Sequence, residues 1–321
     1  MARPNPEAAP RKPVPRFRTL IPAETNIDFV RIAPVMIGIS AAACVLSVVL
    51  LMTRGLNYGT DFAGGTLVQV RFVQPSSAAD VRSALEEGKV AGAVVQDVGG
   101  EQREFQIRIG EVEEGAAEKG ATEVRAALQA RFGEGSYEVL RVDTVGPKVG
   151  RDLWRDATLA VLASTVLMGI YIAVRFDLRF GIGAAVALAH DVLVTLGALV
   201  ITQMEFDLTT VAALLTIVGF SVNDTVVVSD RIRENLRKRR RDALPDVINA
   251  SINETLSRTL ITSGTAILVV VALLVLGGDV IRSFAFSLLV GFIAGVYSSV
   301  YVAAPLVLWM ERWGSVPART R

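Results

Sequence analysis

The chain has 321 residues, of which 51% are hydrophobic, and its mean hydropathy is positive. This composition excludes an ordinary soluble domain and predicts a polytopic membrane protein. The formal net charge is only +1, so total charge indicates no partner. One cysteine and one histidine exclude a disulfide within the chain and a His/Cys metal cluster.

Six long apolar runs are predicted to cross the membrane as helices. Each is close to the roughly 20 residues that span about 30 Å of hydrocarbon. The fifth run is short, and we expect its helix to extend backward through Thr259 and Arg258. The runs are Ile32–Thr53, Ala157–Val174, Gly181–Ile201, Leu208–Val228, Leu260–Leu276 and Phe284–Met310.

Basic residues predict the orientation of these helices. The termini and the short loops on their side hold 19 Lys and Arg, whereas the short loops of the opposite side hold one. The positive-inside rule therefore places both termini of this multi-pass protein in the cytoplasm. The expected organisation is a cytoplasmic tail (1–31), a first helix (32–53), an extracytoplasmic domain (54–156), five more helices (157–310) with a cytoplasmic loop (229–259), and a second cytoplasmic tail (311–321).

The segment between the first two helices predicts an α+β domain. Alternating apolar residues and turn signals give the order strand, helix, strand, strand, helix, strand, with Gly99-Gly100 as a hairpin turn. This order fits a ferredoxin-like split βαβ sandwich. The predicted elements are Gly65–Phe72, Ser77–Glu87, Val90–Val98, Arg103–Ile109, Glu113–Phe132 and Tyr137–Val145.

Motifs for nucleotides and nucleic acids are absent from the sequence. Neither a Gly-x-x-x-x-Gly-Lys-Ser/Thr loop nor a Gly-x-Gly-x-x-Gly turn after a strand occurs, so we expect no bound nucleotide and no cofactor. The basic run Arg237–Arg241 adjoins the membrane without interleaved aromatic residues. It is predicted to anchor the topology and to meet anionic lipid head groups rather than nucleic acid.

Only two acidic residues, Asp191 and Asp224, lie inside the apolar runs. A carboxylate inside a bilayer costs several kcal/mol, about 2.5–3.5 on insertion scales, and usually marks an ion or proton path. In the fourth run, Thr216, Gly219, Phe220 and Asn223 are predicted to share one helix face with Asp224 on its flank. Small and polar residues on one face predict contact with another helix.

The fifth run places Arg258, Thr262 and Thr265 on one face, with Arg258 at the membrane depth of Asp224. A carboxylate beside a guanidinium stays ionised, whereas one separated from it in an apolar site takes up a proton. Asp224 and Arg258 therefore form either a protonation switch or a static ion pair that orients two helices.

Other polar and small residues of the runs suggest packing contacts. His190 and Asp191 are adjacent, about 100° apart on a helix, so we expect one to face the bundle and the other a neighbouring subunit. Asp191 either supports an ion path or accepts a structural hydrogen bond. Gly291 and Gly295 predict close helix packing, and Leu244–Leu256 predicts a short helix on the cytoplasmic interface.

Several segments together resemble the SecF family, the membrane components of the bacterial SecDF complex in the resistance–nodulation–division superfamily. The resemblance covers about residues 17–312. Its most specific stretch is Val222–Asn235, which contains the sequence Val-Asn-Asp-Thr-Val-Val-Val-Ser-Asp-Arg. The others are residues 57–66, 145–150, 255–260 and 262–265.

The resemblance implies a proton-driven accessory subunit of the Sec translocase, and not an enzyme. It implies a SecD-like six-helix partner, association with the SecYEG translocon, and a translocating unfolded polypeptide as cargo. Asp224 corresponds to the proton-relay carboxylate of the family and Arg258 to its essential partner. Asn223, Asp191 and Thr262 are supporting candidates.

Two alternatives are weaker. A half-size exporter of small molecules or lipids would carry a larger outer region than one domain of about 100 residues. A diaspartyl protease needs two carboxylates that share a proton at one depth. Asp191 lies near the middle of its run and Asp224 nearer the end, and no Gly-x-Gly-Asp sequence surrounds Asp224.

Overall fold

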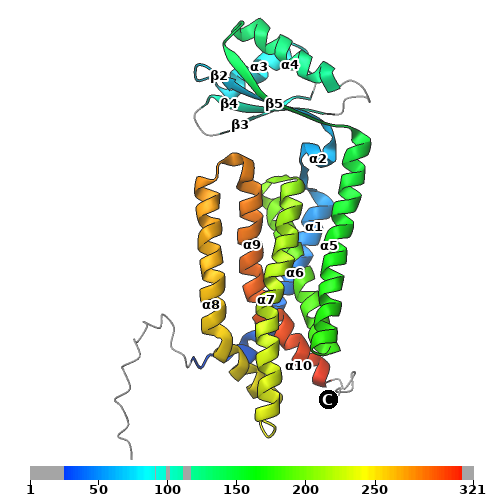
Figure 1. The fold of residues 1–321 in the computed structure, drawn as a ribbon, viewed down its shortest axis with the longest axis vertical. Helices are drawn as coiled ribbons and strands as arrows, with labels where there is room; N and C mark the ends of the chain where they lie inside the picture. The colour runs from blue at the N-terminus through cyan, green and yellow to red at the C-terminus, as the bar shows by residue number, and fades with distance from the viewer. Residues whose placement is uncertain (1–24, 91, 99–101, 111–116, 313–321) are drawn as a thin grey trace, which may run out of the picture.

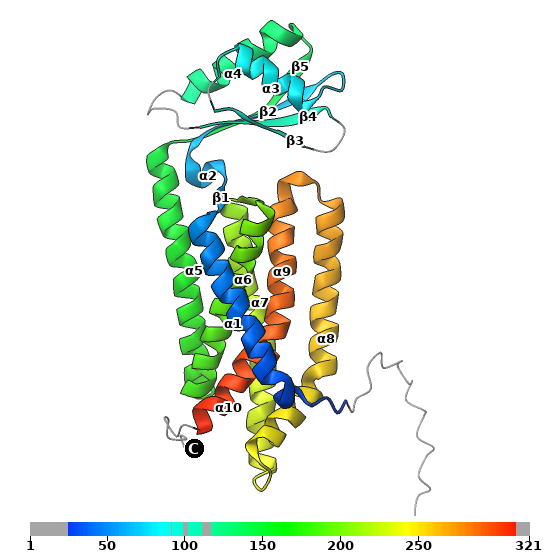
Figure 2. The same cartoon turned by 180° about the vertical axis from the view of Figure 1, so that it is seen from behind.

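The computed structural model describes residues 25–90, 92–98, 102–110 and 117–312. It consists of a helical bundle with a small sheet domain stacked on one end (Figure 1). Both ends of the described chain lie at the opposite end of the bundle (Figures 1 and 2).

Within the described ranges, six helical spans are long and apolar enough to cross a membrane, which confirms the predicted number. The sixth is composed of α9 (Arg282–Ser298), a π-helical turn η2 (Ser299–Ala303) and α10 (Ala304–Arg312). The short 3-10 helix η1 (Asp279–Ile281) precedes it. The other spans are α1 (Phe29–Thr53), α5 (Pro147–Arg175), α6 (Leu178–Thr202), α7 (Leu208–Lys238) and α8 (Leu244–Leu276).

Several helices extend well beyond the apolar runs that predicted them. Pro147 occupies the first turn of α5, where its fixed φ favours helix and its missing N–H costs nothing. Helix α8 begins at Leu244, so the extension through Arg258 is confirmed. The separate interfacial helix over Leu244–Leu256 is wrong, because α8 continues past Leu256 into the fifth span and no glycine or proline stands between Leu256 and Ser263 to end it.

The centre of the bundle is formed by α6, α7 and the sixth span. Each buries 56% of its most apolar stretch, whereas α1, α5 and α8 bury 11–17% and expose the rest. Small residues permit the close crossings at the centre. A Cβ at Gly291 would overlap the side chain of Ile217 on α7, and one at Gly181 would overlap Ala173 on α5. The predicted tight packing of the sixth span is therefore confirmed.

The sheet domain has the predicted ferredoxin-like order. Its antiparallel sheet has the strand order β3-β4-β2-β5, and α3 and α4 cover one face (Figure 1). The ends of β2 and β5 are as predicted, and β3 is shorter. The Gly99-Gly100 turn lies outside the described residues. The elements are β2 (Gly65–Phe72), α3 (Ala78–Glu87), β3 (Val94–Asp97), β4 (Glu104–Ile109), α4 (Ala117–Phe132) and β5 (Tyr137–Val145).

Alternate residues of the strands separate the two faces of this sheet. Val68, Val70, Phe105 and Ile107 point toward the helices and are almost completely buried, together with Leu128 of α4. The intervening residues are mainly polar, and the face that carries them is turned toward the bundle (Figure 1).

A junction that the sequence did not predict joins the two parts. Strand β1 (Asn57–Tyr58) pairs in parallel with β6 (Glu205–Phe206), which connects α6 to α7. The short helix α2 (Thr60–Ala63) follows β1. The rings of Tyr58, Phe62, Trp154 and Phe206 pack together here with centroid separations of 5.2–6.3 Å.

Glu205 lies at the centre of this junction. Its carboxylate pairs with Arg108 of β4, whose guanidinium also donates to the carbonyl of Tyr58 at 2.9 Å. Burial raises the pKa of Glu205 above its usual value, and the nearby carboxylates of Asp207 and Asp61 raise it further, while Arg108 lowers it. The sheet domain is thus held to the bundle by a partly buried ion pair.

Candidate functional site: polar groups inside the bundle

Asp224 lies on the buried face of α7, opposite α8. Its side chain is 3% exposed, and Ser263 of α8 donates a hydrogen bond of 2.7 Å to Oδ2. Helices α7 and α8 therefore stand side by side, as predicted. A carboxylate held by one hydroxyl donor inside an apolar bundle is a candidate for an ion or proton site.

Arg258 does not form an ion pair with Asp224. Among the described residues, no nitrogen of Arg258 lies within 4 Å of a carboxylate oxygen, so the predicted static ion pair is wrong for this structure. Ser263 follows Arg258 by five residues, which is about 140° around a helix. Because Ser263 faces Asp224, Arg258 is turned to the exposed side of α8, although its charge still acts on Asp224.

Most of the stripe predicted to contact another helix faces outward. Thr216, Gly219 and Asn223 are exposed, and nothing lies within 4 Å of a Cβ placed at Gly219. Phe220 of the same stripe is partly buried, and its ring stacks on that of Phe292 on α9 with 3.8 Å between centroids. Thr262 of α8 is exposed as well. The described residues therefore leave Thr216, Gly219 and Asn223 without cover.

Asp191 is completely buried at the crossing of α6, α7 and α9. Three side chains donate to its carboxylate: Ser221 at 2.6 Å, Ser298 at 2.9 Å, and His190, whose Nδ1 lies 2.9 Å from Oδ1. The prediction that His190 and Asp191 face different partners is therefore wrong. The imidazole nitrogen reaches the neighbouring carboxylate although the two Cβ atoms diverge.

Further buried hydroxyl groups lie beside the hydrogen-bond partners of Asp191. Thr225 Oγ1 lies 2.9 Å from Ser299 Oγ, in the π-helical turn η2. Single-turn π-helical insertions are rare and often occur at functional sites. Ser221 and Asp224 are three residues apart and share one face of α7. Because Ser221 donates to Asp191 of α6, the carboxylates of Asp191 and Asp224 both lie at this face of α7.

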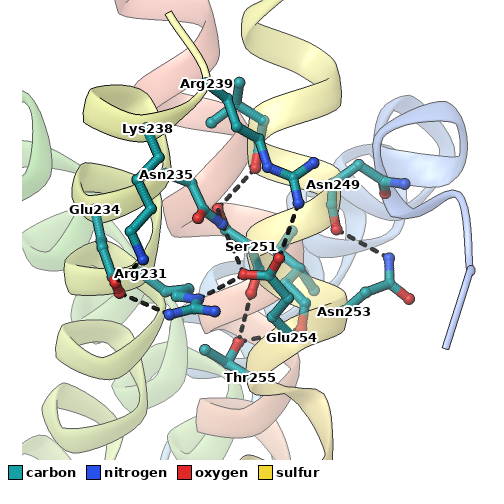
Figure 3. Close-up of polar contacts among 12 residues, drawn as sticks. Arg231, Glu234, Asn235, Lys238, Arg239, Asn249, Ser251, Asn253, Glu254 and Thr255 are labelled. Atoms are coloured by element: carbon teal, nitrogen blue, oxygen red, sulfur yellow. Dashed lines mark hydrogen bonds and ion pairs between the residues drawn. The ribbon is translucent and has the colours of Figure 1, made fainter. Parts of the chain in front are cut away.

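A second polar network joins the last turns of α7 to the first turns of α8 (Figure 3). It lies at the end of the bundle remote from the sheet domain (Figure 1). Glu254 accepts from Arg231 at 2.5 Å, from Asn235 at 2.8 Å and from Arg239 at 3.1 Å. Glu234 binds Arg231 and Lys238 on α7 itself. The sequence signals for this network are the i,i+3 spacing of Arg231 and Glu234 and the i,i+4 spacing of Glu234 and Lys238.

Arg258 lines a groove of about 660 Å³ between α5, α7 and α8, close to this network. Asp230, Arg231 and Arg175 border the same groove. The groove gives Arg258 a polar, water-accessible surrounding at the edge of the bundle. In the ranges that the structure describes, no three His, Cys, Asp or Glu side chains gather as metal ligands.

Comparison with known proteins identifies the family. Residues 124–313 match the family described as "Protein export membrane protein SecD/SecF, C-terminal", and residues 49–76 match the "SecD/SecF GG Motif". The protein translocase subunit SecF of Vibrio alginolyticus is 44% identical over 289 residues, which cover 90% of this chain and 91% of that protein. The chain belongs to the SecF family.

Other members and structures agree with this. The SecF subunit of Cereibacter sphaeroides is 45% identical over 298 residues, with 91% of each chain covered. The crystal structure of SecDF from Thermus, described as a translocon-associated membrane protein, matches with a TM-score of 0.81 and 37% identity. A SecDF structure in a "super-membrane-facing form" matches with a TM-score of 0.68. The chain covers 40% of each of these SecDF chains.

The backbone conformation of this fold explains the two glycines of the SecD/SecF GG motif. Gly64 and Gly65 link α2 to β2 with φ angles of +74° and +114°, which L side chains rarely adopt. A Cβ at Gly65 would also overlap the carbonyl oxygen of Ile109 on β4. Both glycines are therefore required where the sheet domain begins.

Proposed function

We propose that this protein is an accessory subunit of the Sec protein translocase, driven by the proton-motive force, that promotes polypeptide export across the bacterial cytoplasmic membrane. The similarity to protein translocase subunits named SecF and to SecDF supports this role. In the proposal both termini and residues 229–259 are cytoplasmic, and residues 54–156 lie outside. The basic-residue count of 19 against one supports this orientation.

The main support for the proposal is that small and polar residues without cover lie beside the buried Asp224. This buried carboxylate borders a stripe of small and polar residues on α7, comprising Thr216, Gly219 and Asn223, that no described residue covers. Polar and small groups in a membrane span are normally covered by another helix. We infer that a SecD-like partner with six helices packs against this stripe, and that the pair associates with the SecYEG translocon.

The proposed proton step uses Asp224, Ser263 and Arg258. Asp224 takes up a proton while Ser263 is its only side-chain donor among the described residues. The long side chain of Arg258, free of an ion pair in its groove, then approaches the site after proton release and stabilises the ionised carboxylate. Ser263 and Arg258 both belong to α8 but lie on different sides of it. A change of the donor to Asp224 from one to the other would therefore move α8, which couples the protonation of Asp224 to the position of that helix.

Export of a secreted reporter in a strain that depends on this copy tests the proposal. Asp224→Asn keeps the shape but cannot ionise, and should abolish proton-dependent export without reducing the amount of assembled complex. Arg258→Lys keeps the charge but loses the planar multi-donor group, and should impair export. Asp191→Asn serves as the structural comparison, expected to retain part of the export. Normal export by Asp224→Asn at a normal protein level would show that the proton path runs elsewhere.

A further inference from the structure

Four hydroxyl side chains follow one another along the face of α8 that contacts α7. They recur at every fourth residue, so each lies one helical turn from the next. All four are buried, and none is more than 7% exposed. We refer to Ser251, Thr255, Thr259 and Ser263 as the hydroxyl row.

The two ends of the hydroxyl row are joined to α7 by hydrogen bonds. At one end, Ser263 donates to Asp224 at 2.7 Å. At the other end, Ser251 accepts from Asn235 at 3.0 Å, within the polar network of Figure 3. Because α7 and α8 stand side by side between these two contacts, the row leads from the buried carboxylate to the end of the bundle remote from the sheet domain.

Thr259 is the exception within the row. Serine and threonine inside helices commonly donate to a carbonyl one turn earlier, as Ser251 does to Val247 at 2.7 Å and Thr255 to the carbonyl of Ser251 at 3.0 Å. The Oγ1 of Thr259 is buried and has no hydrogen-bond partner among the described residues. Internal waters in proteins typically bind such otherwise unpaired polar groups.

The spacing of the row suits such waters. Thr259 lies about 6 Å along the helix from both Ser263 and Thr255. This is too far for hydroxyls to bind each other directly, but it is close to the span of two hydrogen bonds of about 2.8 Å each that share one water. Thr255 borders the groove of about 660 Å³ that also contains Arg258. One buried hydroxyl, that of Thr259, therefore stands between this groove and the pair of Asp224 and Ser263.

Packing alone would not require this hydroxyl. Valine has nearly the shape of threonine, and it would fill the same space without burying a polar group that lacks a partner. The presence of threonine here therefore points to a role for the hydroxyl itself.

We propose that Thr259 relays the proton between Asp224 and the cytoplasmic side, through water held along the hydroxyl row. This inference rests on the proposed function and adds the cytoplasmic part of the proton path to it. A hydroxyl both accepts and donates a hydrogen bond, so it can take up a proton on one side while it releases its own on the other. The proton that leaves Asp224 thus reaches the water in the groove, and the hydroxyls of Ser263 and Thr259 are left neutral.

The test measures proton flow through the assembled complex of the full-length protein in vesicles that contain a pH-sensitive dye, after a pH gradient is imposed. Thr259→Val keeps the shape of the side chain and removes the hydroxyl. We expect the rate of proton flow to fall roughly tenfold, the effect of one hydrogen bond lost from the path, with the amount of assembled complex unchanged. Thr259→Ser keeps a hydroxyl and should retain most of the flow.

An infrared measurement separates a relay from an effect on packing. The carbonyl band of protonated Asp224 is assigned by its absence in Asp224→Asn. In Thr259→Val this band should still respond to a change of pH on the outer side, but it should respond much more slowly to a change on the cytoplasmic side. A packing defect would alter both responses alike.

Thr195→Val is the matched control, because Thr195 is a buried threonine of α6, outside the hydroxyl row, that donates to the carbonyl of Asp191 at 2.8 Å. Its proton flow should equal that of the unchanged protein. If Thr259→Val assembles poorly, Thr255→Val removes the next hydroxyl of the row and should slow the flow as well.

Normal proton flow in assembled Thr259→Val or Thr255→Val would overturn the relay alone. An equal loss of flow in Thr195→Val, or equal slowing of the two infrared responses, would also overturn it. Absence of proton flow through the unchanged complex would instead refute the proposed function.

Discussion

Replacing Gly65 with alanine is predicted to destabilise the sheet domain severely. Gly65 begins β2 with a φ of +114° and pairs with Val145 of β5. A Cβ at this position would overlap the carbonyl oxygen of Ile109, a backbone atom that cannot rotate away. The strand end must therefore shift until the two atoms are at least 3.0 Å apart.

The expected magnitude combines two effects. The unfavourable φ costs about 1–3 kcal/mol for a residue other than glycine. Shifting the end of β2 weakens the pairing of Thr66 with Ile109, and each lost ladder hydrogen bond costs roughly 0.5–1.5 kcal/mol. With one ladder hydrogen bond lost, the sum is roughly 1.5–4.5 kcal/mol, a large part of the 5–15 kcal/mol typical of a domain.

Pulse proteolysis of the full-length protein in detergent, across a urea series, measures the free energy of unfolding of the sheet domain. Two matched glycines separate the effects. Gly133 has a φ of +84° but open space around its Cβ position, so Gly133→Ala should cost only about 1–2 kcal/mol. Gly110 has open space and no positive φ, so Gly110→Ala should be near neutral. If Gly65→Ala were no more destabilising than Gly133→Ala, the reasoning from backbone overlap would be refuted.

Three further predictions follow from the contacts of other residues. Burial raises the pKa of Glu205 above its usual 4.5, so the folded chain binds this proton more tightly than the unfolded chain. This proton therefore stabilises the folded state fully below the unfolded-state pKa, and the stabilisation is lost as the pH rises through the higher folded-state pKa. In Glu205→Gln this pH dependence of the free energy of unfolding should disappear. Gly291→Leu should prevent close packing of α9 on α7, since even a Cβ overlaps Ile217, and the yield of folded protein in detergent should drop. Ser263→Ala removes the donor to Asp224 and should shift the pH profile of reporter export, whereas an unchanged profile would mean that this hydrogen bond does not influence proton uptake.

Much of the architecture was decided by local sequence patterns. Apolar runs near 20 residues long must cross a bilayer as helices, because only internal hydrogen bonding satisfies their backbone there. The alternation in Gly65–Phe72 and Tyr137–Val145 predicted both strand boundaries, since a strand with one buried face repeats every two residues. The segregation of charge likewise identified Asp191 and Asp224 as the two exceptional carboxylates.

Only the tertiary structure decided what these side chains meet. The sequence placed Asp224 and Arg258 at one depth, but the rotation of α8 about its axis presents Ser263 to the carboxylate and turns Arg258 outward. The same applies to the junction of β1 with β6, whose two strands lie far apart in the sequence. Helix periodicity fixes which residues share a face, whereas the rotation of that face toward a particular neighbour depends on the packing of all the other helices.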